Sequence, residues 1–420
     1  MNNSQKYFIA VLCCALKKNV DGVFDRLGLK SEDLCEDVKK EATRLSEIHS
    51  LAGLFNEGLI LLSEDPTEKM RRTMASAALV AKAGKRYAEM RSAVEYLCNK
   101  GIPVTVMKGF VMREYYPVPE YRSFGDIDLL IGKAEGDKAR KALEELGYKQ
   151  VNNELHVIGM KNDQYYFELH TDLLADDFFV PQGAESLLRA PLEYTRPREG
   201  LEGATEFTPE FHFLYLILHI AKHFYCMGAG VRMFLDLCLM MENAKVNWKI
   251  AGEYLKTAGM ARFAKTVLGV CEKLFGTEAP KELTFAICEE GGQVSSEVIE
   301  ETTEYVLKGG VFGFQGPAYE VAKLRQAYME NPEAVNEENQ SGVLKKTASK
   351  AVLPDRKTME SRYPFCRKKP WLLPVAHLVR IYKVFTDRRR ARSAVVRMKR
   401  LCASEEAARK QVDFYRNIGL

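Results

Sequence analysis

The chain has 420 residues, of which 46% are apolar and 28% are charged. These values are ordinary for a soluble, folded protein of two to four domains or one large composite body. No segment reaches about 18 uninterrupted apolar residues, so no transmembrane helix is expected.

The charge is distributed unevenly. Residues 356–400 hold 15 Lys and Arg against 2 Asp and Glu, a net charge of +13. Because the whole chain carries +4, the remainder carries a net charge of −9. The basic stretch is therefore expected to contact a polyanion or an acidic partner.

The ten cysteines are scattered and form neither a CxxC pair nor a zinc-type spacing. Most lie among apolar residues, which suits reduced thiols in the core of a cytoplasmic protein. Residues 7–16 (YFIAVLCCAL) have the apolar character of a signal peptide. They are short, lack a small-residue cleavage site and run into Lys17 and Lys18, so a buried amphipathic helix is favoured.

The predicted elements change in kind along the chain. Apolar positions recur at helical spacing through residues 1–100, and residues 68–100 contain no proline, so this region is expected to be helical. From residue 101 the pattern becomes strand, helix, strand, helix and then antiparallel strands, which predicts a small mixed sheet with helices on one side. Strands are expected at 102–109, 126–131, 148–151, 154–160 and 164–170, and helices at 110–116 and 134–147.

A helical pattern returns after residue 206, with Thr208 as N-cap and Pro209 in the first turn of a helix. The chain is thus predicted to be an α+β protein, with a small mixed β-sheet core flanked by N-terminal and C-terminal helical regions. Five regions are expected: an N-terminal helical region (1–100), the sheet core (101–205), a helical domain (206–328), a linker or loop (329–349) and a basic C-terminal helical region (350–420).

Two aspartates, Asp126 and Asp128, open the apolar run at 129–131. Residues two apart on a strand share a face, so both carboxylates point the same way, and Glu168 has the same relation to His170 on a later strand. If the two strands are neighbours, three carboxylates meet and repel one another. Mg²⁺ relieves such repulsion, and two ions can clamp a phosphoryl displacement.

Other interpretations of these acids remain open. Asp126 can pair with Arg122 or cap a turn, and Glu168 can be a solvated strand residue. A calcium-binding loop is excluded, because Leu130 and Ile131 stand where such a loop needs an oxygen ligand and a glycine. An aspartyl phosphatase would place the two aspartates after its apolar strand.

Lys108 and Gly109 end the first predicted strand and lead into a helix. A glycine at this position lets backbone N–H groups approach phosphate oxygens, and the lysine adds a point charge. The alternative is an ordinary turn between a strand and a helix.

Together these motifs resemble a known family. The Lys-Gly pair at 108–109, the YYP at 115–117 and RSFGDIDLLI at 122–131 are similar to nucleotidyltransferases of the DNA polymerase beta-like superfamily. Within it, the chain resembles an uncharacterised bacterial family, similar to abortive-infection toxin nucleotidyltransferases. FELH at 167–170 resembles the strand that carries that family's third carboxylate.

The resemblance implies a nucleotidyltransferase core at 101–205 that transfers a nucleoside monophosphate from a nucleoside triphosphate to a hydroxyl acceptor. Two Mg²⁺ ions are expected, held by Asp126, Asp128 and Glu168, which would also be the catalytic residues. The acceptor can be a small molecule, a protein or an RNA. Many members have Gly-Ser after the first strand, whereas this chain has Gly109-Phe110. The abortive-infection branch also lacks that serine.

A second group of polar residues lies on later helices. His219 and His223 are four residues apart and share a helical face, with Lys222 between them and Arg232 further on. They can bind zinc, form a polar seam with Asp236, or bind the triphosphate. The expected nucleotide-binding residues are Lys108, Gly109, Arg122, His219, Lys222, His223 and Arg232.

Two other functions are possible for the chain. It can be a catalytically inactive nucleotidyltransferase-like module for binding or regulation, or a zinc hydrolase centred on His219 and His223. The basic helix expected at 387–400 can dock on the acidic remainder of the chain, bind RNA or lie on a membrane surface.

Overall fold

The computed structural model describes residues 1–123, 125–153, 156–174, 183–226, 228–310, 318–329, 365–386 and 404–420, with single positions 356, 359, 363, 396 and 399. The chain forms two compact units. The larger comprises Met1–Phe224 and Gly228–Gly313, and the smaller is mainly Phe314–Ile418. The five narrower regions expected from the sequence stay a prediction.

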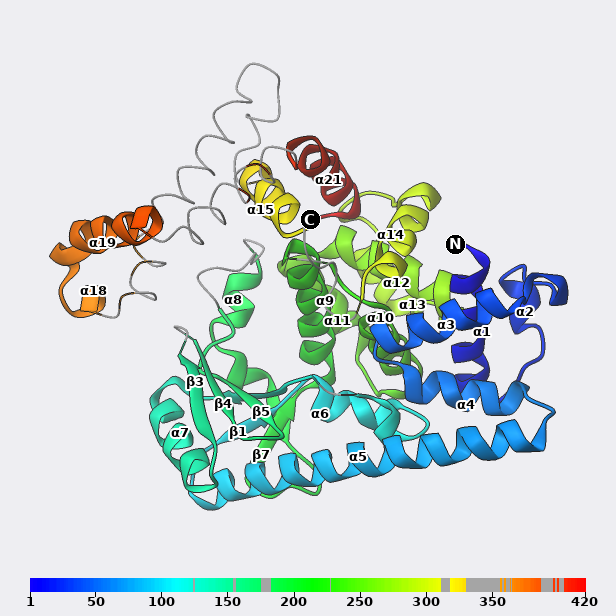
Figure 1. Ribbon diagram of the computed structural model, residues 1–420, viewed down its shortest axis with the longest axis horizontal. Helices are drawn as coiled ribbons and strands as arrows, with labels where there is room; N and C mark the ends of the chain where they lie inside the picture. Colours follow the sequence, from blue (N-terminus) through cyan, green and yellow to red (C-terminus); the bar gives the residue numbers. More distant parts are fainter. Residues whose placement is uncertain are drawn as a thin grey trace. The chain divides into compact units, whose positions relative to one another are not determined.

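The larger unit begins with the helices expected over residues 1–100, of which α5 is the longest (Figure 1). In α1, the side chain of Asn2 accepts a hydrogen bond from the backbone N–H of Gln5, and the side chain of Gln5 accepts one from the backbone N–H of Asn2, which caps the helix. Residues 7–15 of α1 are all buried, which confirms the predicted buried helix. The bounds are α1 (Asn3–Lys17), α2 (Val23–Arg26), α3 (Glu36–Ile48), α4 (Ala52–Leu62) and α5 (Pro66–Asn99).

A mixed sheet of seven strands follows, in the order β3-β4-β5-β2-β1-β7-β6. Its strands are β1 (Val104–Val106), β2 (Ile127–Ile131), β3 (Lys149–Asn153), β4 (Val157–Lys161), β5 (Tyr166–His170), β6 (Thr195–Pro197) and β7 (Ala204–Phe207). The sheet and its flanking helices confirm the predicted α+β class. The last two strands were not predicted, since they are short and surrounded by turn residues. β7 nevertheless pairs with β1 in parallel.

One face of the sheet is apolar and packs against α5 and α7 (Gly136–Glu145). Ile127, Leu129, Phe167 and Leu169 on this face are at most 1% exposed. The other face carries polar residues and is turned toward α9 (Pro209–Cys226). The expectation that helices cover only one side of the sheet is therefore wrong, because α9 returns over the polar face after β7.

The remaining helices complete the two units. In the larger unit they are α6 (Gly109–Met112), α8 (Ala184–Leu188), α10 (Val231–Asn243), α11 (Trp248–Thr257), α12 (Ala261–Phe275), α13 (Lys281–Ile287) and α14 (Ser296–Lys308). In the smaller unit they are α15 (Ala318–Met329), α18 (Phe365–Lys368), α19 (Leu373–Thr386) and α21 (Glu405–Ile418). Helices α15 and α21 pack through Leu324, Tyr328, Ala408 and Val412.

Two expectations fall on undescribed positions. The linker at 329–349 lies outside the described residues apart from Met329, and so does the Arg-rich helix at 387–400 apart from Val396 and Lys399. Among the described helices, none combines the length and the apolar character needed to cross a bilayer.

The contact between α1 and α4 leaves no room for a side chain at Gly58. A Cβ there would lie 2.1 Å from the backbone oxygen of Val11, whereas one at Gly84 in α5 would meet nothing within 4 Å. We expect Gly58→Ala to lower the free energy of unfolding by about 1–3 kcal/mol through overpacking. Gly84→Ala should raise it by about 0.4–1 kcal/mol, because alanine favours the helix.

Urea denaturation of both variants measures the difference. Equal effects of the two substitutions would contradict the packing described for α1 and α4.

Candidate functional site

The register between β2 and β5 sets the position of the acidic residues. The two strands are parallel, and Asp128 pairs with Glu168 while Leu130 pairs with His170. Because alternate residues share a face, Asp128, Glu168 and His170 lie on the same polar face. One ligand atom from each lies within 4.8 Å of the others. In the described part of the chain, no other group of three such side chains is close enough to hold a metal ion.

Lys108 forms a buried ion pair with Asp128. Its Nζ lies 2.8 Å from Asp128 Oδ1, and both side chains are at most 10% exposed. The residue has a φ of 50°, a conformation that costs a non-glycine residue energy. Its backbone N–H donates to His212 Nε2 over 3.1 Å, which holds this turn against α9. The lysine follows β1, which runs antiparallel to β2, so its side chain reaches the start of β2.

The same oxygen of Asp128 also contacts His170, whose Nε2 lies 2.8 Å away. Burial raises the pKa of Asp128, but Lys108 and His170 outweigh it, so the pKa is well below its usual range. For Lys108 burial acts in the opposite direction, and Asp128 outweighs it to raise the pKa. Burial is also the main reason that the pKa of His170 is lowered. The neutral imidazole therefore donates from Nε2 to an ionised Asp128.

Glu168 behaves differently from Asp128. Its side chain is 26% exposed and lies 3.6 Å from His170. Burial, followed by the charges of Asp128 and Asp126, raises its pKa to about 7. A carboxyl group of this kind is half-protonated near neutral pH, and a cation beside it would favour the ionised form.

Asp126 lies at the bend before β2 and is half-buried. It is outside the group formed by Asp128, Glu168 and His170, although its charge acts on both Glu168 and Lys108. Next to it, the guanidinium of Arg86 donates to the carbonyl of Gly125 over 2.5 Å. The sequence predicts that Asp126, Asp128 and Glu168 hold a metal ion together. In the structure, Asp128 and Glu168 lie close enough for this, whereas Asp126 lies outside their group.

A small cavity of about 50 Å³ adjoins these side chains. Seven of the residues expected from the sequence line it: Lys108, Gly109, Arg122, Asp126, Asp128, His219 and Arg232. The other lining residues come from α9, α10 and the turn at Gly125. Residues separated by more than 120 positions in the chain therefore meet at the polar face of the sheet.

Arg122 is committed to a structural partner. Its guanidinium donates to both carboxylate oxygens of Asp236, over 2.9 and 2.7 Å, and the hydroxyl of Tyr116 donates to Asp236 over 2.9 Å. These groups are buried. Arg122 therefore pairs with Asp236 and not with Asp126. The donors to Asp236 are Arg122 and Tyr116, so the polar seam expected between Asp236 and the two histidines is not among the hydrogen bonds described.

Arg232 on α10 is a different kind of cation. It is 9% exposed, and its Nη1 donates to the carbonyl and the hydroxyl of Ser123 over 3.0 and 3.1 Å. Its Nε has no hydrogen-bond partner, and no carboxylate of the described residues forms an ion pair with it. Burial and the charge of Arg122 lower its pKa. A buried guanidinium of this kind, facing a cavity, suits an anionic ligand.

The α9 residues approach the same region from the other side. His219 lines the cavity, and its ring packs edge-on against that of His223, with centroids 4.6 Å apart. Burial lowers the pKa of both histidines, that of His223 to about 3, so both are neutral. The charge of Lys222 acts on Glu168 and His170. A zinc site at His219 and His223 gains no third ligand from the described residues.

The roles of three residues at the site, His170, Tyr116 and Asp236, were not predicted. His170 was noted only as sharing a face with Glu168, although a histidine two residues from a candidate ligand on one strand is itself a candidate ligand. Tyr116 and Asp236 hold Arg122 from distant parts of the chain, and no local pattern connects them.

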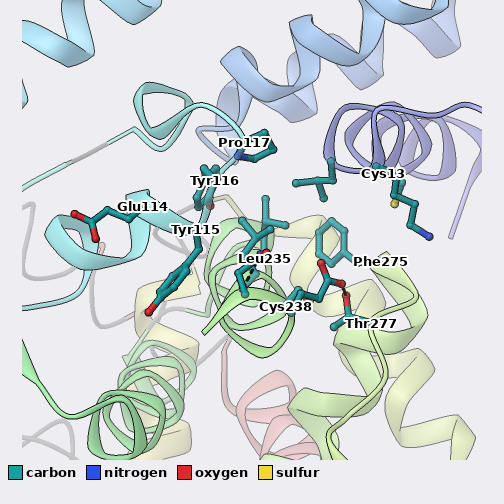
Figure 2. Close-up of a pocket in the computed structure, with 14 residues that line it drawn as sticks. Cys13, Glu114, Tyr115, Tyr116, Pro117, Leu235, Cys238, Phe275 and Thr277 are labelled. Atoms are coloured by element: carbon teal, nitrogen blue, oxygen red, sulfur yellow. Dashed lines mark hydrogen bonds between the residues drawn. The ribbon is translucent and has the colours of Figure 1, made fainter. Parts of the chain in front are cut away.

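A larger cavity of about 540 Å³ lies next to this network. Figure 2 shows the aromatic side chains of Tyr115, Tyr116 and Phe275 around Leu235. Tyr116 belongs to the wall of this cavity and also binds Asp236, which lines the smaller one. The candidate metal ligands do not line the larger cavity.

Comparison with known proteins gives one match. The model of a family described as "Uncharacterised nucleotidyltransferase" matches residues 38–276, which is more than half of the chain and includes every residue of the site. No curated protein and no solved structure matches.

The raised pKa of Glu168 predicts a dependence of stability on pH. Its pKa is about 7 in the folded protein and 4.5 ordinarily, so the folded state binds more protons between these values. The free energy of unfolding should therefore fall as pH rises through this window, and level off above it. Glu168→Gln should remove this fall, so the variant becomes more stable relative to the parent chain as pH rises.

Urea denaturation with a chelator present measures both proteins across the window. Glu145→Gln is the matched control, because the pKa of Glu145 is lowered by its hydrogen bond with Lys100. Because the pKa of Glu145 lies below 4.5, that variant should differ from the parent by an amount that changes little across the window. A difference between parent and Glu168→Gln that does not change with pH would contradict the environment described for Glu168.

Proposed function

The chain belongs to the uncharacterised nucleotidyltransferase family, and from that membership we propose that it transfers a nucleoside monophosphate from a nucleoside triphosphate to a hydroxyl acceptor, with Mg²⁺. The observation that carries this proposal is the pairing of Asp128 with Glu168 across β2 and β5, beside a cavity that contains the buried Arg232.

The residues fit a divalent cation. Asp128 and Glu168 supply carboxylate oxygens close together, and Asp126 adds a third at the cavity. The pKa of Glu168 is raised by burial and by the neighbouring aspartates, and a bound cation would relieve that repulsion. Mg²⁺ would neutralise charge on the triphosphate and on the pyrophosphate that leaves. His170 would orient Asp128 through their hydrogen bond.

Some of the positive side chains pair with carboxylates of the protein, and the others would bind the triphosphate. Lys108 keeps Asp128 ionised, and Arg122 is occupied by Asp236. Arg232 and His219, which line the cavity, would then bind the triphosphate, together with Lys222, whose charge acts on Glu168 and His170. Charge neutralisation and positioning would supply most of the catalysis, as expected for phosphoryl transfer.

Glu168 would act as the general base. A base must be ionised to accept a proton, and a bound cation would keep Glu168 ionised. It would take the proton of the acceptor hydroxyl as that oxygen bonds to the α-phosphorus. The bond from the α-phosphorus to the bridging oxygen breaks, and pyrophosphate leaves.

The first prediction from this proposal concerns activity. With each labelled nucleoside triphosphate, Mg²⁺ and a cell extract, the protein should place label on one size fraction of acceptor. Asp126→Asn and Glu168→Gln should each lower the transfer rate by about 10²-fold or more, because both groups act on the reacting centre. Both should keep the circular dichroism spectrum of the parent.

Glu145→Gln, an exposed carboxylate on α7, is the activity control and should transfer label normally. Full turnover by Asp126→Asn and Glu168→Gln would exclude these assignments. If the parent binds a nucleoside triphosphate in calorimetry but transfers none to any fraction, the chain is instead the inactive binding module.

The second prediction separates the two buried arginines. Arg232→Met should raise KM for the triphosphate about tenfold or more, since a charged hydrogen bond is lost, without lowering Tm. Arg122→Met should lower the free energy of unfolding by about 3–5 kcal/mol, because Asp236 then keeps a buried charge without its partner.

Thermal denaturation and initial rates distinguish the outcomes. If Arg232→Met lost as much stability as Arg122→Met and left KM unchanged, the role of Arg232 would be structural.

A further inference from the structure

Helix α19 and the turn before it expose a row of large apolar side chains. Trp371 is 73% exposed and Leu378 is 67% exposed, which is unusual for such residues on a single helix. The positions recur at spacings of three and four residues and so lie on one helical face. The exposed residues of this row are Trp371, Val375, Leu378, Val379 and Tyr382.

The other side of the helix is already packed. Ala376 is fully buried in a small cluster with Met359 and Cys366, and Leu373 packs against that cluster. The apolar row thus contributes nothing to this local core. In the structure described for this unit, the side chains of Trp371, Val375, Leu378 and Val379 are exposed to solvent.

The charge around the row is of one sign. Residues 365–386 contain 5 Lys and Arg and no Asp or Glu. The wider stretch 356–400 has 15 Lys and Arg against 2 Asp and Glu. A surface that is both apolar and strongly basic is complementary to a layer that offers hydrocarbon beneath negative charge.

We propose that α19 lies on a membrane surface rich in anionic lipid headgroups. The helix has 14 residues, too few to cross a bilayer, and would lie in the plane of the interface. The apolar row would enter the boundary between headgroups and acyl chains, where Trp and Tyr are favoured. The flanking lysines and arginines would bind the headgroups.

Other partners fit less well. The phosphates of an RNA match the basic residues but leave Val375, Leu378 and Val379 in water. The same surface of a second copy of the chain would bring the same positive charge and be repelled. The proposal is independent of the proposed transferase activity, and its test requires no turnover.

The chain offers a built-in reporter for the test. It has two tryptophans, and the other is the half-buried Trp248, which packs edge-on against Phe213 with ring centroids 5.2 Å apart. Trp248→Phe therefore leaves Trp371 as the single tryptophan of the full chain. With vesicles containing about 30 mol% phosphatidylserine, its emission should shift to the blue and brominated acyl chains should quench it. Vesicles of phosphatidylcholine alone should give neither effect.

Co-sedimentation with the same vesicles measures the affinity. Leu378→Asp should weaken binding at least tenfold, because a charge enters the apolar row while the packed side of α19 is unchanged. Phe285→Asp is the matched control, since Phe285 is 81% exposed on α13 of the larger unit. It should bind as the parent does. High salt should weaken binding of all three.

Three results would overturn the proposal. One is an unchanged Trp371 emission with anionic vesicles, and another is equal vesicle binding by Leu378→Asp and the parent. The third is capture of a single-stranded RNA oligonucleotide together with failure to bind vesicles, which would assign the basic surface to nucleic acid. Circular dichroism of Leu378→Asp verifies that the helix is retained.

Discussion

The buried ion pair between Lys108 and Asp128 is the interaction on which the site depends. Asp128 is 8% exposed and stands next to Glu168 on the neighbouring strand. Two carboxylates on neighbouring strands repel one another when both are ionised, unless a cation lies close to them. The ammonium of Lys108 lies against Asp128, so this carboxylate keeps its charge while the pKa of Glu168 rises to about 7. Lys108, helped by His170, thus keeps the pKa of Asp128 low, whereas burial and the charges of Asp128 and Asp126 raise the pKa of Glu168.

Buried arginines of the larger unit also pair with carboxylates. Arg122 holds Asp236, Arg113 holds Glu120, and Arg198 holds Glu206. A buried pair of this kind adds little net stability, yet removal of one partner costs about 3–5 kcal/mol, so each fixes the geometry of the segments that carry it. Arg232 differs, since the described residues supply it with no such carboxylate. Of the two arginines that line the cavity, Arg122 is thus neutralised within the fold, whereas Arg232 keeps its charge facing the cavity.

The apolar side of the sheet makes this arrangement rigid. Ile127 and Leu129 on β2 and Phe167 and Leu169 on β5 are buried against α5 and α7. A shift of either strand by one residue would turn its own two apolar side chains out of this core and its own acid into it. The position of the acids is therefore fixed by hydrophobic packing on the opposite face, whose free energy far exceeds that of any single polar contact in the site.

The sequence by itself determined the α+β class, the helical N-terminal region, the first five strands, and the alternation that puts Glu168 and His170 on the same face of their strand. All of these follow from local periodicity, which acts within a few residues. It did not reveal β6 and β7, which are short and held by pairing with β1, or the role of His170. Nor could it assign partners to Arg122 and Arg232. Asp236 is 114 residues from Arg122 and Ser123 is 109 residues from Arg232, so no local pattern connects them. Only the tertiary structure decided which arginine is neutralised, since ion pairing depends on distance in space and not on separation along the chain.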